Sequence, residues 1–180
     1  MRCFYFLLFI CYSFGIYSQE KYITRNGKVQ FNASTPLEDI KPTNNYVSCI
    51  LDTENGNIVF QLKMLSFQFE KALMEEHFNE KYVESEKFPT STFIGRILNW
   101  SSIDRNINEH NIVAQGKINI HGVEKEIEAK GNMKFINSDI QISSEFSINI
   151  NDFDIRIPKL VKDKISKEVS VDVFMKLNPK

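Results

Sequence analysis

The sequence has few glycines, few prolines and almost no excess of one charge. Its 180 residues include seven glycines and five prolines, so the chain is neither collagen-like nor a flexible linker. Lys and Arg number 22 against 23 Asp and Glu, and a net charge of −1 lacks the basic excess of a general nucleic-acid-binding protein. The hydrophobic fraction of 42% is that of an ordinary folded domain. We therefore expect one folded domain that has no nucleic-acid partner.

Apolar runs long enough to cross a membrane are also missing beyond the first residues. The apolar stretch over residues 4–14 is too short for a span of about 20 residues. Arg2 precedes this stretch and Ser18 follows it, which is the layout of a secretory signal peptide. We expect residues 1–18 to be a cleaved signal peptide and residues 19–180 to be the mature domain. The protein would then be periplasmic or secreted, without a stable transmembrane anchor.

Cysteine is scarce as well. Of three cysteines, Cys3 and Cys11 fall in the predicted signal peptide, which leaves Cys49 with no partner for an intramolecular disulfide. Cys49 lies in a strand-like run where Val47 and Leu51 share its face. This pattern favours a buried structural thiol over a nucleophile. Stability must then come from a hydrophobic core.

What the sequence has in plenty is alternation of apolar and polar residues, which is typical of strands with one buried face. Turn residues at 52–56 and at 121–122 each separate two alternating segments and predict hairpins. Asn26-Gly27 is the strongest local hairpin signal, and it predicts a turn between residues 22–24 and 29–31. The clearest alternation runs over residues 169–177 at the C-terminal end.

Two segments interrupt the strand pattern. Residues 70–83 are rich in helix formers, with Met74, Phe78 and Tyr82 on one stripe, and they predict a helix. Residues 160–167, after Pro158, predict a second, short helix. About eight strands joined mostly by short turns indicate an all-β protein with a minor helix, built as an antiparallel barrel or sandwich.

Catalytic motifs are absent from the sequence. It contains no nucleophile elbow, no phosphate-binding glycine loop and no dinucleotide fingerprint. The histidines His77, His110 and His121 are widely separated. Glu76, His77 and Glu80 could together hold a metal weakly, although charged residues on a helix usually form a solvated face. We expect no catalytic residue, no metal and no cofactor.

Nine aromatic residues of the predicted mature domain are spread over several predicted elements, and a large core explains only part of them. They are Phe60, Phe67, Phe69, Phe78, Tyr82, Phe88, Phe93, Phe146 and Phe153. The interior of an eight-stranded barrel is just wide enough to be filled by side chains or to hold one small ligand. Binding of an apolar chain there needs no motif, because the hydrophobic driving force is non-directional.

Three stretches of the chain carry longer motifs in a fixed order. They read MEEHFNEKY and ESEKFP at residues 74–82 and 84–89, NIHGVEK at residues 119–125, and DFDIRIP at residues 152–158. In order and spacing they resemble the YceI-like family, and the resemblance runs from about Tyr22 to Leu177. The chain departs from the family pattern at Phe153, where the family has Tyr, and at Ile118-Asn119, where it has Leu-Thr.

The resemblance implies an eight-stranded antiparallel lipocalin-like β-barrel with one helical excursion. It also implies a bound polyisoprenoid or other long-chain apolar lipid, although the motifs are largely architectural and members need not share one cargo. On this reading the inward faces of the strands form the lipid pocket, with Met74 and Phe78 closing one end. The expected ligand-binding residues are Phe60, Leu62, Met64, Phe67, Met74, Phe78, Phe93, Ile142, Phe146 and Ile148.

Two alternatives stay open at this point. One is an enzyme on the same barrel that uses His77 or His121 as a base, and the other is an exported structural domain with a filled interior. A lipid with an anionic head group would need a cationic mouth, for which Lys63, Arg96 and Lys125 are candidates by charge alone. The sequence leaves the oligomeric state open, including a dimer.

Overall fold

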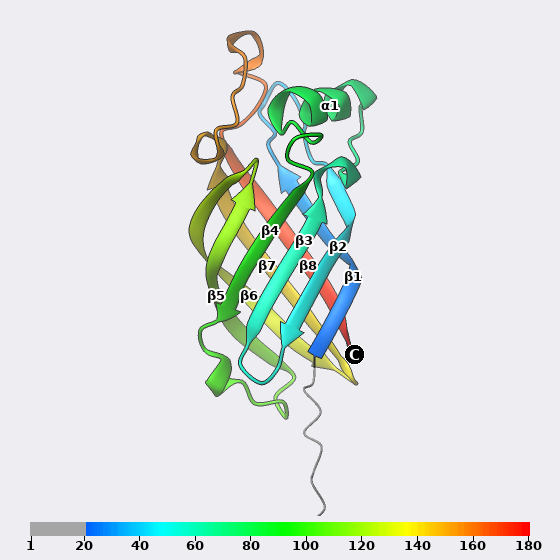
Figure 1. Ribbon diagram of the computed structural model, residues 1–180, viewed down its shortest axis with the longest axis vertical. Helices are drawn as coiled ribbons and strands as arrows, with labels where there is room; N and C mark the ends of the chain where they lie inside the picture. Colours follow the sequence, from blue (N-terminus) through cyan, green and yellow to red (C-terminus); the bar gives the residue numbers. More distant parts are fainter. Residues whose placement is uncertain (1–20) are drawn as a thin grey trace, which may run out of the picture.

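Eight antiparallel strands form a closed barrel in the computed structural model, which describes residues 21–180 (Figure 1). Each strand pairs with the next along the chain, and the last pairs with the first. The strands are β1 (Lys21–Asn32), β2 (Thr43–Asp52), β3 (Asn57–Lys63), β4 (Thr90–Ile97), β5 (Glu109–Ile120), β6 (Val123–Ile136), β7 (Asp139–Asn149) and β8 (Glu168–Pro179). The predicted eight-stranded antiparallel barrel is therefore confirmed. The expected signal peptide lies outside the described residues.

The period-two pattern of the sequence sets which side chains face inward. In β7 the apolar residues occupy even positions from Ile140 to Ile148, and the odd positions carry polar residues that face solvent. β7 pairs with β8 over ten residues, so that Ile142 lies opposite Met175 and Phe146 opposite Val171. The inward rows of neighbouring strands thus meet in one interior.

The helical excursion covers one end of the barrel, the upper end in Figure 1. It consists of α1 (Ala72–His77) and a π-helical turn, η2 (Phe78–Tyr82), which together confirm the helix predicted over residues 70–83. Two 3₁₀ turns follow strands: η1 (Met64–Ser66) comes after β3, and η3 (Trp100–Ser102) comes after β4. A third, η4 (Ile150–Phe153), follows β7.

The second predicted helix, over residues 160–167, is wrong. The segment contains only a 3₁₀ turn, η5 (Lys159–Val161), and its backbone bonds join residues three apart, from Val161 to Pro158 and from Lys164 to Val161. An eight-residue segment is too short to sustain an α-helix in water without extensive packing.

The hairpin predicted at Asn26-Gly27 is also wrong, because β1 runs straight through it. The pairing of β1 with β2 shifts on both sides of Gly27, which marks an irregularity in the strand rather than a turn. A Cβ at Gly27 would lie 2.0 Å from the sulfur of Met175 on β8. The glycine therefore leaves room for the side chain of Met175 on the neighbouring strand β8.

The lower end of the barrel is closed by packed side chains, which we call the base. Its members are almost fully buried, with exposed fractions of 0–1%, and they are Leu51, Met133, Ile140, Met175 and Leu177. Below them the Trp100 indole donates a hydrogen bond to the carbonyl of Thr53 at 3.2 Å and packs against Gly56.

Cys49 is fully buried in β2, as predicted. Burial raises the pKa of its thiol, because the low-polarity interior disfavours the thiolate. We expect the thiol of the mature chain to resist modification by a thiol reagent until the protein is unfolded in urea. Cys49→Ala should cost about 1 kcal/mol of stability, and rapid labelling of the native protein would contradict this placement.

Candidate functional site: an apolar cavity in the barrel

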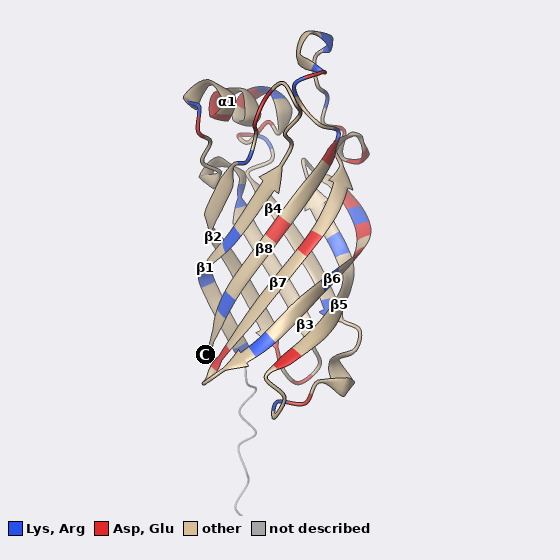
Figure 2. Ribbon diagram, turned by 180° about the vertical axis from the view of Figure 1, so that it is seen from behind, with Lys and Arg blue, Asp and Glu red and all other residues tan. Residues whose placement is uncertain are grey.

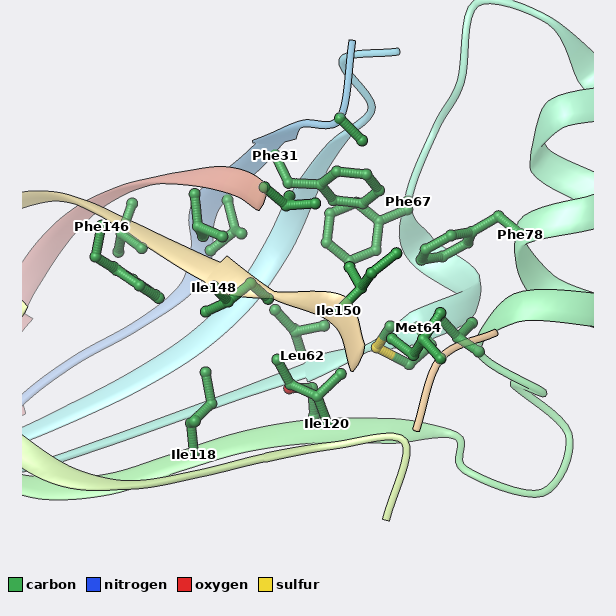
Figure 3. Close-up of a pocket in the computed structure, with 18 of the residues that line it drawn as sticks. Phe31, Leu62, Met64, Phe67, Phe78, Ile118, Ile120, Phe146, Ile148 and Ile150 are labelled. Atoms are coloured by element: carbon green, nitrogen blue, oxygen red, sulfur yellow. The ribbon is translucent and has the colours of Figure 1, made fainter. Parts of the chain in front are cut away.

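The interior above the base is hollow. A cavity of about 500 Å³ extends from the middle of the barrel to its upper end and is lined by residues from all eight strands and from α1 and η2 (Figure 3). Its volume is that of a typical small-ligand site. The side chains drawn around it in Figure 3 are almost entirely carbon, so the cavity suits an apolar ligand.

All ten residues that the sequence marked for the lipid pocket line this cavity. Phe60 and Leu62 come from β3, Phe93 comes from β4, and Ile142, Phe146 and Ile148 come from β7. The remaining four lie at the upper end: Met64 and Phe67 follow β3, and Met74 and Phe78 belong to α1 and η2. That these side chains contact a lipid stays a prediction.

Burial along the inward rows distinguishes the hollow from the base. Inward residues in the upper half of the strands, such as Leu62, Phe146 and Ile148, are only partly buried although they point into the barrel. Protein interiors are normally packed without gaps, so an inward apolar side chain that remains accessible faces open space. Ile140, the base residue on the same strand as Phe146 and Ile148, is only 1% exposed.

Small residues widen one side of the cavity. Ala114 on β5 lies directly opposite Ala129 on β6, and Gly131 and Ser144 follow on β6 and β7. None of these was among the predicted site residues. Their signal in the sequence is the placement of small residues at inward positions of otherwise apolar strands.

Four phenylalanines cover the upper end of the cavity. Phe31, Phe67, Phe69 and Phe78 pack with ring centroids 5.0–6.1 Å apart, mostly edge to face. They come from β1, from the segment after β3 and from η2. Figure 3 shows Phe31, Phe67 and Phe78 grouped between the cavity and the helical excursion. Phe31 and Phe69 were not among the predicted site residues.

An ion pair lies at the mouth of the cavity. Lys71 Nζ is 2.6 Å from Glu38 Oε1, and both residues line the cavity. This hydrogen bond lowers the pKa of Glu38 and raises the pKa of Lys71, and Lys164 adds to the positive potential at Glu38. The pair joins the β1–β2 loop to the segment that leads into α1.

The three cations proposed from the sequence do not line the cavity. Lys63 and Arg96 are exposed and occupy outward positions of β3 and β4, next to the inward Leu62 and Ile97, and Lys125 is exposed on β6. The cations that do line the mouth, Lys71 and Lys164, come from segments outside the strands, where no periodicity indicates orientation.

His121 joins the three stretches that carry the family resemblance. Its Nε2 lies 2.9 Å from a carboxylate oxygen of Glu84, and its Nδ1 lies 3.0 Å from the carbonyl oxygen of Phe153. The ring of Phe88 packs edge to face against the imidazole at 4.6 Å. His121 sits in the β5–β6 turn with φ of 53°, does not line the cavity, and ties η2 and η4 to the barrel. Its contacts are those of a structural residue.

The Glu84–His121 contact gives stability a dependence on pH. The hydrogen bond from His121 lowers the pKa of Glu84, so the carboxylate contributes stability above the unfolded pKa of about 4.3 and loses it as the pH falls through the lower, folded value. Glu84→Gln should therefore lower the urea midpoint at neutral pH and change it less near pH 3. Glu86→Gln is the control, and an equal loss for both variants at neutral pH would contradict the assignment.

Within residues 21–180 no group of three His, Cys, Asp or Glu side chains is placed to hold a metal ion, so Glu76, His77 and Glu80 do not form such a site. Over the same residues no helix has the length and apolar character needed to cross a membrane.

The chain was compared with protein families, curated proteins and solved structures. Residues 20–177 match the family model described as a YceI-like domain. None of the curated proteins matches significantly. Among solved structures, a polyisoprenoid binding domain from Saccharophagus degradans implicated in plant cell wall breakdown superposes with a TM-score of 0.78 at 12% identity, over 91% of this chain and 100% of that one.

Two further structures share the fold. BcnA of Burkholderia cenocepacia gives a TM-score of 0.68 at 13% identity, over 84% of this chain and 95% of that one. The YCEI protein of Campylobacter jejuni gives 0.58 at 16% identity, over 74% and 81%. At these identities the likeness concerns the fold, while the family model spans nearly all of the described residues. The chain belongs to the YceI-like family.

Proposed function

We propose that the mature protein is an exported carrier or binding protein that holds a polyisoprenoid or other long-chain apolar lipid in its barrel. The observation that carries this proposal is the hollow of about 500 Å³ with apolar walls above a packed base. An empty apolar hollow of this size forgoes packing that the sequence could have supplied with larger side chains. A ligand that restores those contacts is the simplest use for it.

The energetics favour a long apolar chain. Burial of one CH₂ group contributes about 0.8 kcal/mol, so a five-carbon isoprene unit contributes about 3–4 kcal/mol before the cost of ordering the chain. The walls offer few hydrogen-bond partners, among them Ser91 and Ser144, whose hydroxyls already donate to main-chain carbonyls. A polar ligand would lose its hydration without replacement.

The related domain from Saccharophagus degradans is described as polyisoprenoid binding, which supports the same class of ligand for this chain. The alternative of a filled interior does not account for the partly accessible inward rows. The alternative of an enzyme would use His77 or His121 as a base. His121 gives it no support, since both of its ring nitrogens are engaged by Glu84 and Phe153. His77 does line the cavity, but the cavity wall is mainly apolar, and among residues 21–180 no nucleophile is hydrogen-bonded to His77. We therefore favour a binding protein without catalytic activity.

Native mass spectrometry of the protein, expressed with its first 18 residues and purified without detergent, tests the proposal. We expect a discrete added mass that organic solvent extracts and that fragments as a long-chain lipid. Protein that carries no added mass, and takes up no long-chain lipid offered in solution, would favour the structural alternative. A polar adduct with turnover would favour an enzyme.

Export rests on Arg2, the apolar stretch over residues 4–14 and Ser18. We expect the exported protein to begin at or near Gln19 when its N-terminus is sequenced. An extracytoplasmic form that begins at Met1 or Arg2 would contradict cleavage.

A further inference from the structure

The segment between η4 and β8, residues 154–167, combines basic charge with an exposed leucine. It begins with Asp154, and its residues 156–167 carry one further acidic residue, Asp163. Leu160 is 94% exposed, more than any other large apolar residue described. The five basic residues of this segment are all exposed, and they are Arg156, Lys159, Lys162, Lys164 and Lys167. In Figure 1 the segment projects beyond the upper end of the barrel, past α1.

The other side of the same segment belongs to the cavity. Ile157, Val161 and Ile165 line the cavity, as does Lys164. One short stretch of chain therefore forms part of the cavity mouth and, on its outer side, the most projecting surface of the molecule. Any surface that contacts Leu160 lies close to the cavity mouth.

The opposite side of the mouth has a different charge. Residues 70–81 carry four glutamates and two lysines, so the α1 side is net acidic. Leu73 on this side lines the cavity and is 60% exposed, but it lies among these carboxylates. Figure 2 shows acidic positions over α1 and basic positions along the projecting segment. An anionic surface would therefore attract residues 156–167 and repel the α1 side of the mouth.

We propose that residues 156–167 dock on an anionic lipid bilayer, with Leu160 inserted at the boundary between head groups and acyl chains. Exposed apolar side chains flanked by Lys and Arg are typical of segments that lie at membrane interfaces. Each basic residue near an anionic surface strengthens binding about fivefold. Docking by this end places the cavity mouth against the membrane, so the role rests on the proposed function of the cavity.

Co-sedimentation of the mature protein with lipid vesicles tests the docking. One set of vesicles contains phosphatidylcholine alone, and the other contains equal amounts of phosphatidylcholine and phosphatidylglycerol. We expect the protein to bind the anionic vesicles only. This binding should decrease strongly when NaCl is raised from about 0.01 M to about 1 M, because the Debye length then falls from about 30 Å to about 3 Å. Leu160→Ser and the double variant Lys159→Glu/Lys162→Glu should each weaken vesicle binding at least about tenfold, because they remove the inserted apolar side chain or reverse two basic charges. All three side chains are exposed, so the unfolding midpoints of the variants should not change.

Matched controls come from the outer wall of the barrel. Ile94 on β4 is 62% exposed, so Ile94→Ser removes an exposed apolar side chain from a different face. Lys28 on β1 and Lys130 on β6 are exposed, so Lys28→Glu/Lys130→Glu makes the same change of net charge. We expect both control proteins to bind the anionic vesicles like the parent. Equal losses in the control and segment variants would overturn the proposal.

Equal binding of the parent protein to both kinds of vesicle would also overturn the docking proposal. So would a lack of binding to either kind, and an acidic protein would then be the better partner for residues 156–167. Native mass spectrometry separates this proposal from the proposed function. A lipid adduct without preference for anionic vesicles refutes the docking alone. Vesicle binding that depends on Leu160, in a protein that neither carries nor takes up lipid, supports the docking and refutes the carrier.

Discussion

Tryptophan in place of Ala114 is expected to abolish lipid binding and to leave the barrel folded. The Ala114 side chain faces the cavity and lies opposite the equally small Ala129 on the neighbouring strand. An indole at this position would enter the hollow and occupy the space that a lipid chain needs. In a close-packed interior the same change would cost about 1–3 kcal/mol. Here we expect the melting temperature to stay within a few degrees of the parent value, or to rise.

Uptake of a fluorescent long-chain lipid, followed with thermal unfolding of the lipid-free protein, measures both effects. Gln115→Trp is the control, because Gln115 is the exposed, outward neighbour on the same strand. This variant should bind lipid and unfold like the parent. Strong destabilisation by Ala114→Trp, together with unchanged lipid uptake, would show that the interior is packed and that lipid binds elsewhere.

Leu177→Ala is expected to have the largest effect on stability while leaving the binding site unchanged. Leu177 belongs to the base, has no accessible surface and does not line the cavity. Truncation there leaves a cavity within packed surroundings, which typically costs about 2–5 kcal/mol. The urea midpoint of the lipid-free protein should fall accordingly, while lipid affinity at low temperature should stay close to that of the parent.

Phe146→Ala provides the comparison. Phe146 is partly accessible and faces the hollow, so its loss removes fewer contacts and enlarges a space that already exists. It should cost less stability than Leu177→Ala but weaken lipid binding more. If the two variants lose similar stability and similar affinity, the division between packed base and open cavity is incorrect.

The barrel could be predicted from sequence because strand alternation is a local signal that tertiary structure preserves. The alternation of apolar and polar residues along β7 is enough to identify Ile142, Phe146 and Ile148 as inward-facing. Gly27 shows where the local signal ends. Asn-Gly in an extended stretch is expected at a tight turn and at a strand irregularity alike, and the decisive contact is with Met175, far along the chain on β8.

The mouth could not be predicted for a related reason. Glu38 and Lys71 pair across 33 residues of sequence, between two segments without regular structure. Lys63 and Arg96 have the charge that an anionic head group needs, but the alternation along their strands places both side chains outside the barrel. The small residues Ala114 and Ala129 were visible in the sequence, but the width of a cavity depends on which positions face each other after the barrel closes.

The packed base closes the lower end of the barrel formed by residues 21–180, so this barrel is not a tube open at both ends. A lipid chain that entered past Phe78 would meet Leu51, Met133 and Met175 at the base and could not leave through the lower end. If the barrel holds a lipid as proposed, that lipid could not pass through the protein from the upper end to the lower end. Transfer of a lipid between two membranes would then require the protein to leave the first membrane and present the same upper end to the second.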